Sequence, residues 1–299
     1  MLKNTNIMNF IASDIISIKD LNQSFVDVDD LIRMRNFVLS RNFVVFDFSG
    51  CNFLGPTAVV VLGAIFAEMR NNGVKFIINW ASMSRKVLAN LCQNGFAKSQ
   101  NYSHSPWVGN SVPYRQDVEG NPNEIISHLT EKWLNKAWIN FSDKLRNAIV
   151  GRVWEMYANA FEHSKAACGV FSCGQYFYTK KELVLSVVDF GVGIPEKIRS
   201  FLVQRDPNTF SDADCLKWAF ESGNTTEVEA NIPRGLGLDL LREFVYLNHG
   251  SLEIYSGNGY AVVNEKGLSF INRVSHFQGT LVQLKIVCDD RVYRFKSES

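Results

Sequence analysis

The chain has 299 residues, which predicts two domains or one large one, at about 100–200 residues per domain. Hydrophobic residues make up 46% and charged residues 20%, a composition that excludes a disordered chain. The formal net charge is +1 and no long block of one sign occurs, so a nucleic-acid-binding surface is not indicated.

Cysteine usage and the apolar runs bear on the compartment. No CxxC pair and no Cys/His cluster with zinc spacing occurs, so a structural zinc site is not expected. The N-terminus lacks a signal-peptide pattern, and the longest apolar run, residues 58–67, is too short to span a bilayer. We therefore expect a cytoplasmic protein with reduced thiols and no membrane partner. The cysteines are Cys51, Cys92, Cys168, Cys173, Cys215 and Cys288.

The first third of the chain alternates strand-like and helix-like segments. Residues 43–48 and 74–79 are rich in β-branched and aromatic residues and predict strands, whereas residues 57–70 and 84–92 predict helices. This βαβα order predicts a small α/β layer. Residues 99–122 hold several Pro, Gly and polar residues and are interpreted as an irregular connector.

The second part begins with helical patterns and ends with strands. Two helices are expected first, then an antiparallel pair of strands, a long polar insert over 195–234, a short helix and three more strands. The helices are expected at 124–135, 142–163 and 236–247, and the strands at 169–178, 182–188, 251–256, 259–263 and 279–287.

The helix at 142–163 carries a polar row. Glu155, Asn159 and His163 stand at positions i, i+4 and i+8 and therefore share one face of an otherwise apolar helix. Polar groups buried in such a helix need partners, because burial without them is costly. The alternative is a half-exposed helix with a solvated edge.

Glycines follow two of the predicted elements. Asp189 ends a strand and is followed by Gly191 and Gly193, which allow the backbone to approach a ligand closely. Gly235 and Gly237 open a helix, where exposed N–H groups favour an anion. Neither a dinucleotide fingerprint nor a P-loop is present, and each motif taken alone is compatible with a plain turn.

The order of these motifs resembles the GHKL nucleotide-binding family, which includes gyrase, histidine kinases and MutL. The quoted segments are NAFEHS, VVDFGVGIP, RGLGLDLL and a Gly-Thr before the last strand, over about 123–287. The resemblance implies the Bergerat α/β sandwich over 123–299, with ATP and Mg²⁺ as ligands. It also implies that 195–234 is the ATP lid.

The resemblance also implies a role for each matching residue. Asn159 would hold Mg²⁺, Glu155 would position or deprotonate the attacking group, and Asp189 would accept a hydrogen bond from the adenine amine. Arg234 is equally compatible with a phosphate contact and with a solvated surface charge. The other residues implied at the nucleotide are Gly191, Gly193, Gly235, Leu236, Gly237 and Thr280.

The pattern in the helix at 142–163 looks closest to the anti-sigma-factor serine-kinase branch of that family. A histidine-kinase phosphosite at His128 is the weaker alternative. Histidine kinases carry their phosphorylated histidine on a dimerising helical hairpin, beside an acidic residue, and His128 lacks that acidic neighbour. A histidine satisfied locally on a helix face is the preferred interpretation. The lid, which is polar and holds only a short apolar helix at about 215–220, is expected to bury little.

Residues 43–96, within a first domain of 1–98, resemble the STAS family of anti-sigma-factor antagonists. The matching segments are FDFSGCNFLGPTAVVVLGAIF, MRNNGVKFIINWAS and VLANLCQNGF. Where that family carries a regulatory phosphoserine, this chain has Pro56 and Thr57. Pro56 suits the first turn of a helix, and Thr57 is expected to cap or pack rather than to accept a phosphate.

These observations predict a two-domain α/β protein: a STAS-like domain over 1–98, a connector over 99–122 and a GHKL domain over 123–299. The predicted function is an ATP-binding regulator, an ATPase or protein kinase whose lid state alters contacts with a protein partner or a second copy through the STAS-like domain. The alternatives are a nucleotide-gated binding module without turnover and a scaffold with a decayed site.

Overall fold

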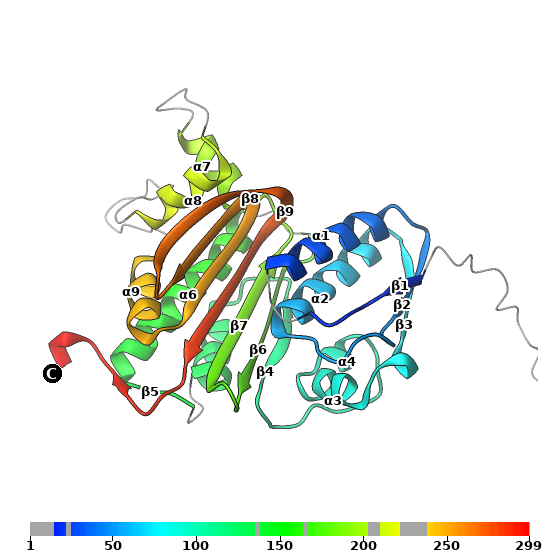
Figure 1. Ribbon diagram of the computed structural model, residues 1–299, viewed down its shortest axis with the longest axis horizontal. Helices are drawn as coiled ribbons and strands as arrows, with labels where there is room; N and C mark the ends of the chain where they lie inside the picture. The colour runs from blue at the N-terminus through cyan, green and yellow to red at the C-terminus, as the bar shows by residue number, and fades with distance from the viewer. Residues whose placement is uncertain are drawn as a thin grey trace, which may run out of the picture.

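The computed structural model describes residues 15–21, 25–134, 138–163, 167–202, 210–221 and 238–298. Within these ranges the chain is a mixed α/β protein with three sheets, of three, five and two strands. Figure 1 shows the three-stranded sheet and the five-stranded sheet on either side of helices α1 (Phe25–Leu39) and α2 (Pro56–Asn71).

The N-terminal sheet is parallel and has the order β1-β2-β3, with β1 at Ile15–Ser17, β2 at Phe43–Asp47 and β3 at Lys75–Asn79. After a short 3-10 turn at Trp80–Ser82 come α3 (Arg85–Gln93) and α4 (Phe96–Ser99). Ser84 caps α3, because its hydroxyl accepts a hydrogen bond from the Val87 N–H. The predicted βαβα order is confirmed, whereas β1 and α1 had not been predicted.

The larger sheet is antiparallel, with the order β4-β6-β7-β9-β8. Its strands are β4 (Ser111–Asp117), β6 (Val170–Phe177), β7 (Glu182–Asp189), β8 (Ser251–Asn264) and β9 (Gly267–Val287). Strands 251–256 and 259–263 were predicted separately, but they form one strand that is bulged at Gly257. A small parallel pair joins β5 (Asn140–Phe141) to β10 (Val292–Tyr293), and a 3-10 turn at Lys296–Glu298 follows.

The prediction of an irregular connector was wrong for β4. Pro113 and the polar residues around it suggested a loop. Proline is tolerated on an edge strand, where its missing N–H faces away from the neighbouring strand. β4 is such an edge strand, and its pairing with β6 shifts register between Val112 and Arg115.

Helices cover both faces of the five-stranded sheet (Figure 1). One face carries α6 (Asp143–His163) and α9 (Leu238–Asn248), which share a core with alternate residues of β7 such as Leu183 and Leu185. Helix α5 (Pro122–His128), extended by a π-helical turn at Leu129–Leu134, joins this layer. The predicted helix at 124–135 is therefore present with a change of winding inside it.

Helix α2 covers the opposite face and is the most buried element of the fold. Thirteen of its sixteen residues are buried, as expected for a helix that is apolar on all sides. One side packs on β6 and β7. On the other side the Phe66 ring lies 4.7 Å from Phe46 of β2 and 4.8 Å from Phe76 of β3, measured between centroids. The two sheets therefore share α2 as a common layer.

A buried polar contact fixes the N-terminus of α2 against the larger sheet. The Thr57 hydroxyl donates to Gln283 Oε1 at 2.5 Å, and the Ser186 hydroxyl lies 2.8 Å from the Thr57 hydroxyl oxygen. Since a hydroxyl carries one proton, Ser186 is the donor in the second bond. Thr57 is 2% exposed. The expectation that it packs is confirmed, and its burial leaves no room for phosphate transfer in this conformation.

We expect Thr57→Val to lower the free energy of unfolding by about 1–3 kcal/mol, because Gln283 and Ser186 would stay buried without their partner. Urea denaturation measures this change, and Thr179→Val, at an exposed position, is the matched control. The double variant Thr57→Val/Gln283→Leu should recover part of the loss, since two apolar groups can replace a bonded pair. A Thr57→Val variant with the same free energy of unfolding as wild type would contradict this account.

Candidate functional site

A row of polar side chains crosses the larger sheet on the face that carries α6. Asp189 at the end of β7 is opposite Thr280 of β9, and Thr280 is opposite Ser256 of β8. The neighbouring apolar residues Val187, Val282 and Ile254, two positions away along their strands, belong to the core shared with α6. Because side chains alternate between the faces of a strand, the polar row lies on that same side.

The Ser256 hydroxyl connects two loops at this row. It donates to the Gly279 carbonyl at 2.7 Å, accepts from the Ile194 N–H at 2.9 Å, and lies 3.1 Å from the Thr280 hydroxyl. The turn that follows β7 is thereby held against β9. Ser256 had not been identified from the sequence, because only the register of β8 with β9 places this serine beside Thr280.

Asp189 is a buried carboxyl group. Its side chain is 5% exposed, and Oδ1 accepts a hydrogen bond from the Gly191 N–H at 2.8 Å. Burial raises the pKa of Asp189 to about 7, against the opposing effect of the N–H groups of Gly191 and Thr280. The group therefore changes charge near neutral pH, and a hydrogen-bond donor placed against it would favour the ionised form.

Two glycines allow the close approach of these loops. Gly193 and Gly279 have left-handed φ angles of +80° and +83°. A Cβ on Gly193 would lie 2.7 Å from the Ser256 hydroxyl oxygen, and one on Gly279 would lie 2.1 Å from the Asp189 carbonyl oxygen. Both positions therefore require glycine, for the packing of the loops as well as for the backbone angle.

The polar residues of α6 have partners within the fold. The Asn159 amide donates from Nδ2 to the Glu155 carbonyl at 2.7 Å, and its Oδ1 accepts from Lys197 Nζ at 2.9 Å. Arg152 Nη1 lies 2.6 Å from Glu155 Oε1. The side chain of His163 lies outside the described part. The predicted polar row on α6 is thus present at Glu155 and Asn159, and the cation at Asn159 is the ammonium group of Lys197.

Lys197 is a site residue that the sequence analysis missed. It lies on α7 (Ile194–Leu202), the helix that starts directly after the glycine motif. The available signal was a basic residue in the first turns of that helix, where an acidic residue is the usual preference. Its contact with α6 depends on how α7 packs, which local sequence does not encode.

The insert over 195–234 is only partly described. Arg234, Gly235, Leu236 and Gly237 lie outside the described residues, as do 203–209 and the rest of 222–237. The prediction that the insert buries little was wrong for α7 and for α8 (Asp212–Phe220). Cys215, Leu216 and Phe220 of α8 are in the core, and Asp212 pairs with Arg199 and accepts from the Asn258 N–H at 2.7 Å.

Helix α1 contacts the turn that carries Asp189. The guanidinium of Arg35 lies 4.7 Å from the ring centroid of Phe190, the residue after Asp189, and its Nε donates to Glu68 Oε2 of α2 at 2.6 Å. Asp29 of α1 forms an ion pair with Arg273 of β9, whose side chain is 1% exposed. Helix α1 therefore contacts both the turn after Asp189 and strand β9.

His128 is buried at the end of α5. It is 7% exposed, and its Nε2 has no hydrogen-bond partner among the described residues. The expectation that its hydrogen bonds are satisfied locally was therefore wrong at this atom. Burial, with Arg115 and Lys132 nearby, lowers the pKa of His128 to about 3, so the ring is neutral at physiological pH. A buried ring is not accessible as a phosphoacceptor.

Comparisons with protein-family models and with curated protein sequences returned no match. Within the described ranges, no helix is long and apolar enough to cross a membrane. No three His, Cys, Asp or Glu side chains of the described segments gather as a metal site would require.

We expect the free energy of unfolding of Asp189→Asn, relative to wild type, to rise between pH 4 and pH 7. In the folded protein Asp189 stays protonated up to about pH 7, whereas its model value is 3.8. At Asp189 the folded state thus binds more protons in this window, and the contribution of Asp189 to wild-type stability falls as pH increases. His128 makes stability rise with pH below its unfolded pKa, but this effect is the same in wild type and in Asp189→Asn and cancels in the comparison.

Chemical denaturation at several pH values measures this difference. Asp290→Asn, which removes an exposed carboxyl group on the same part of the chain, is the control and should run parallel to wild type. A difference between Asp189→Asn and wild type that does not change with pH would show that Asp189 is ionised throughout.

Proposed function

We propose that the part of the chain over about 123–299 binds an adenine nucleotide, with Asp189 as the group that recognises the base. The observation that carries the proposal is the row of Asp189, Thr280 and Ser256 beside the close glycine turns. The motif order that resembles the GHKL family supports it, since two of the motif residues, Asp189 and Thr280, are paired across β7 and β9.

The chemistry of this row suits an amine edge. An ionised carboxylate only accepts hydrogen bonds, and the exocyclic amine of adenine donates them. The cost of ionising a buried carboxyl group would be offset by that charge-assisted bond. Guanine presents a carbonyl at the equivalent position and would meet Asp189 acceptor to acceptor. The proposal is therefore specific for adenine over guanine.

The residues of α6 and α7 suit the phosphate end. Asn159 Oδ1 is an oxygen donor of the kind Mg²⁺ accepts, and Mg²⁺ is usually held by one or two protein groups together with phosphate oxygens and water. Lys197, which now donates to this oxygen, already places positive charge there. Mg²⁺, when bound with a nucleotide, would neutralise phosphate charge at this position.

We further propose that the chain is a nucleotide-dependent regulator with the N-terminal α/β part as its protein-binding portion. The contact of Arg35 with Phe190 supports this, because it connects α1 to the turn that carries Asp189. In an ATPase or kinase, Glu155 would orient or deprotonate the attacking group. The ion pair between Arg152 and Glu155 favours a second candidate, a nucleotide-gated module without turnover, since the guanidinium occupies one carboxylate oxygen of Glu155.

We expect wild-type protein to bind ATP in calorimetry and Asp189→Asn to bind it more weakly by about 1–3 kcal/mol, the usual value of a hydrogen bond to a charged group. GTP should bind less tightly than ATP to wild type, and this preference should shrink in the variant. Asp290→Asn is the matched control. The proposal fails if wild type binds neither ADP nor ATP.

The roles of Asn159 and Glu155 are separable. We expect Asn159→Ala to lose the part of ATP affinity that depends on Mg²⁺, because an oxygen ligand is removed. Glu155→Gln should keep that affinity and lose any turnover, measured as phosphate release or phosphate transfer. If wild type binds ATP but shows no turnover, the second candidate, the nucleotide-gated module, is supported. An equal loss of binding in both variants would show that Glu155 acts through its ion pair with Arg152.

A further inference from the structure

Strand β3 forms one edge of the N-terminal sheet, with no further strand paired to it among the described residues. It is the last strand in the order β1-β2-β3. The Lys75 N–H donates to the Asn42 carbonyl on the β2 side at 3.0 Å. Because peptide groups alternate in direction along a strand, those of Phe76 and Ile78 point away from β2. Two N–H groups and two carbonyl groups thus face outward at this edge.

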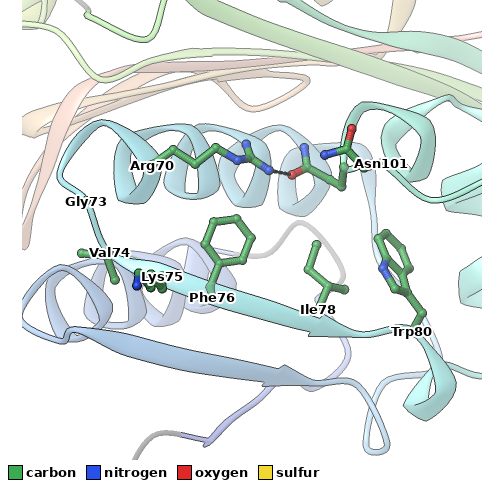
Figure 2. Close-up of a pocket in the computed structure, with 9 residues that line it drawn as sticks. Arg70, Gly73, Val74, Lys75, Phe76, Ile78, Trp80 and Asn101 are labelled. Carbon is green, nitrogen blue, oxygen red and sulfur yellow. Dashed lines mark hydrogen bonds between the residues drawn. The ribbon is translucent and has the colours of Figure 1, made fainter. Parts of the chain in front are cut away.

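A groove follows the same edge (Figure 2). It has a volume of about 480 Å³ and lies between β3, the C-terminal end of α2 and the residues after α4. Phe76 and Ile78 point from the strand toward α2, and Trp80 closes one end. The groove therefore combines an apolar floor with the outward-facing backbone of the same strand.

The charged side chains that line the groove are all basic. Arg70 of α2 lies over it, with its guanidinium 5.1 Å from the Phe76 ring centroid and a hydrogen bond to Gln100 Oε1. Lys75 stands exposed beside it. The described lining holds no Asp or Glu, and no carboxylate of the described chain lies within ion-pair distance of Arg70. A held guanidinium without a counter-charge favours a carboxylate from outside.

We propose that the β3 edge binds an extended acidic segment of a partner protein, which pairs with the backbone of Phe76 and Ile78 and places carboxylates against Arg70 and Lys75. Exposed strand edges accept such additions, and main-chain hydrogen bonds then supply affinity while side-chain sites supply specificity. In a strand added here, apolar side chains would meet the groove floor. A second copy is the poorer occupant, because two such edges would bring like charges together.

The test uses the full chain and a labelled nine-residue peptide, Glu-Glu-Val-Val-Glu-Glu-Val-Val-Glu, which places both glutamate and valine on each face of a strand. Its binding is followed by fluorescence anisotropy. Two matched peptides accompany it: one with lysine for glutamate, and one with the glutamate sequence N-methylated at alternate residues, which cannot pair with a strand. We expect only the unmodified glutamate peptide to bind. Amide exchange of residues 74–80 should slow in its presence.

Arg70→Glu and Lys75→Glu should each raise the dissociation constant at least about tenfold, since a charge-assisted contact becomes a repulsion. Lys86→Glu, the same charge change at an exposed position of α3, is the matched control and should bind like wild type. Arg70→Glu and Lys75→Glu are both included so that a folding defect in one of these two variants cannot decide the outcome.

Four results would overturn the proposal: no binding, equal binding of the lysine peptide, binding of the N-methylated peptide, or slowed exchange confined to other segments. Tighter binding of a single-stranded oligonucleotide than of the glutamate peptide would also overturn it, as would a dimer that Arg70→Glu abolishes. The experiment contains no nucleotide, so its failure leaves the proposed adenine site untouched.

Discussion

Helix α2 lies between two sheets, and the rest of the structure depends on that position. A helix that is buried on every side has no solvated face, so each neighbouring layer must supply apolar area or a matched polar partner. The larger sheet does both, with apolar residues along β6 and β7 and with Ser186 and Gln283 opposite Thr57. β7 is consequently buried on both faces along nearly its whole length.

The same strands that contact α2 carry the polar row. Ser186 and Asp189 both belong to β7, and Gln283 and Thr280 both belong to β9, facing opposite sides of the sheet. Helix α1 adds a second connection through Phe190. A rearrangement of the N-terminal part would therefore displace the strands and the turn that hold Asp189. A single sheet thus separates α2 from the polar row.

The two proposed sites use α2 differently. Its N-terminus is immobilised by the bonds of Thr57, and its C-terminal end presents Arg70 over the groove beside β3. The buried end fixes the direction of the helix. The exposed end places a guanidinium, which has no carboxylate partner within the described ranges, beside the outer edge of β3. Burial at one end and exposure at the other thus separate a structural role from a recognition role within one element.

Local pattern was sufficient for most helices and strands, because periodicity and turn residues act over a few positions: residues 57–70, 84–92 and 182–188 were predicted nearly as observed. The family resemblance also implied that Asp189 and Thr280 belong to one nucleotide site. Tertiary structure decided the rest. The edge strand β4 is stable only through β6, Ser256 joins the row only through the register of β8 with β9, and Lys197 reaches Asn159 only through the packing of α7. Whether Thr57 is a surface hydroxyl or a buried one depends on a partner sheet more than a hundred residues away in sequence, and local sequence carries no record of such a contact.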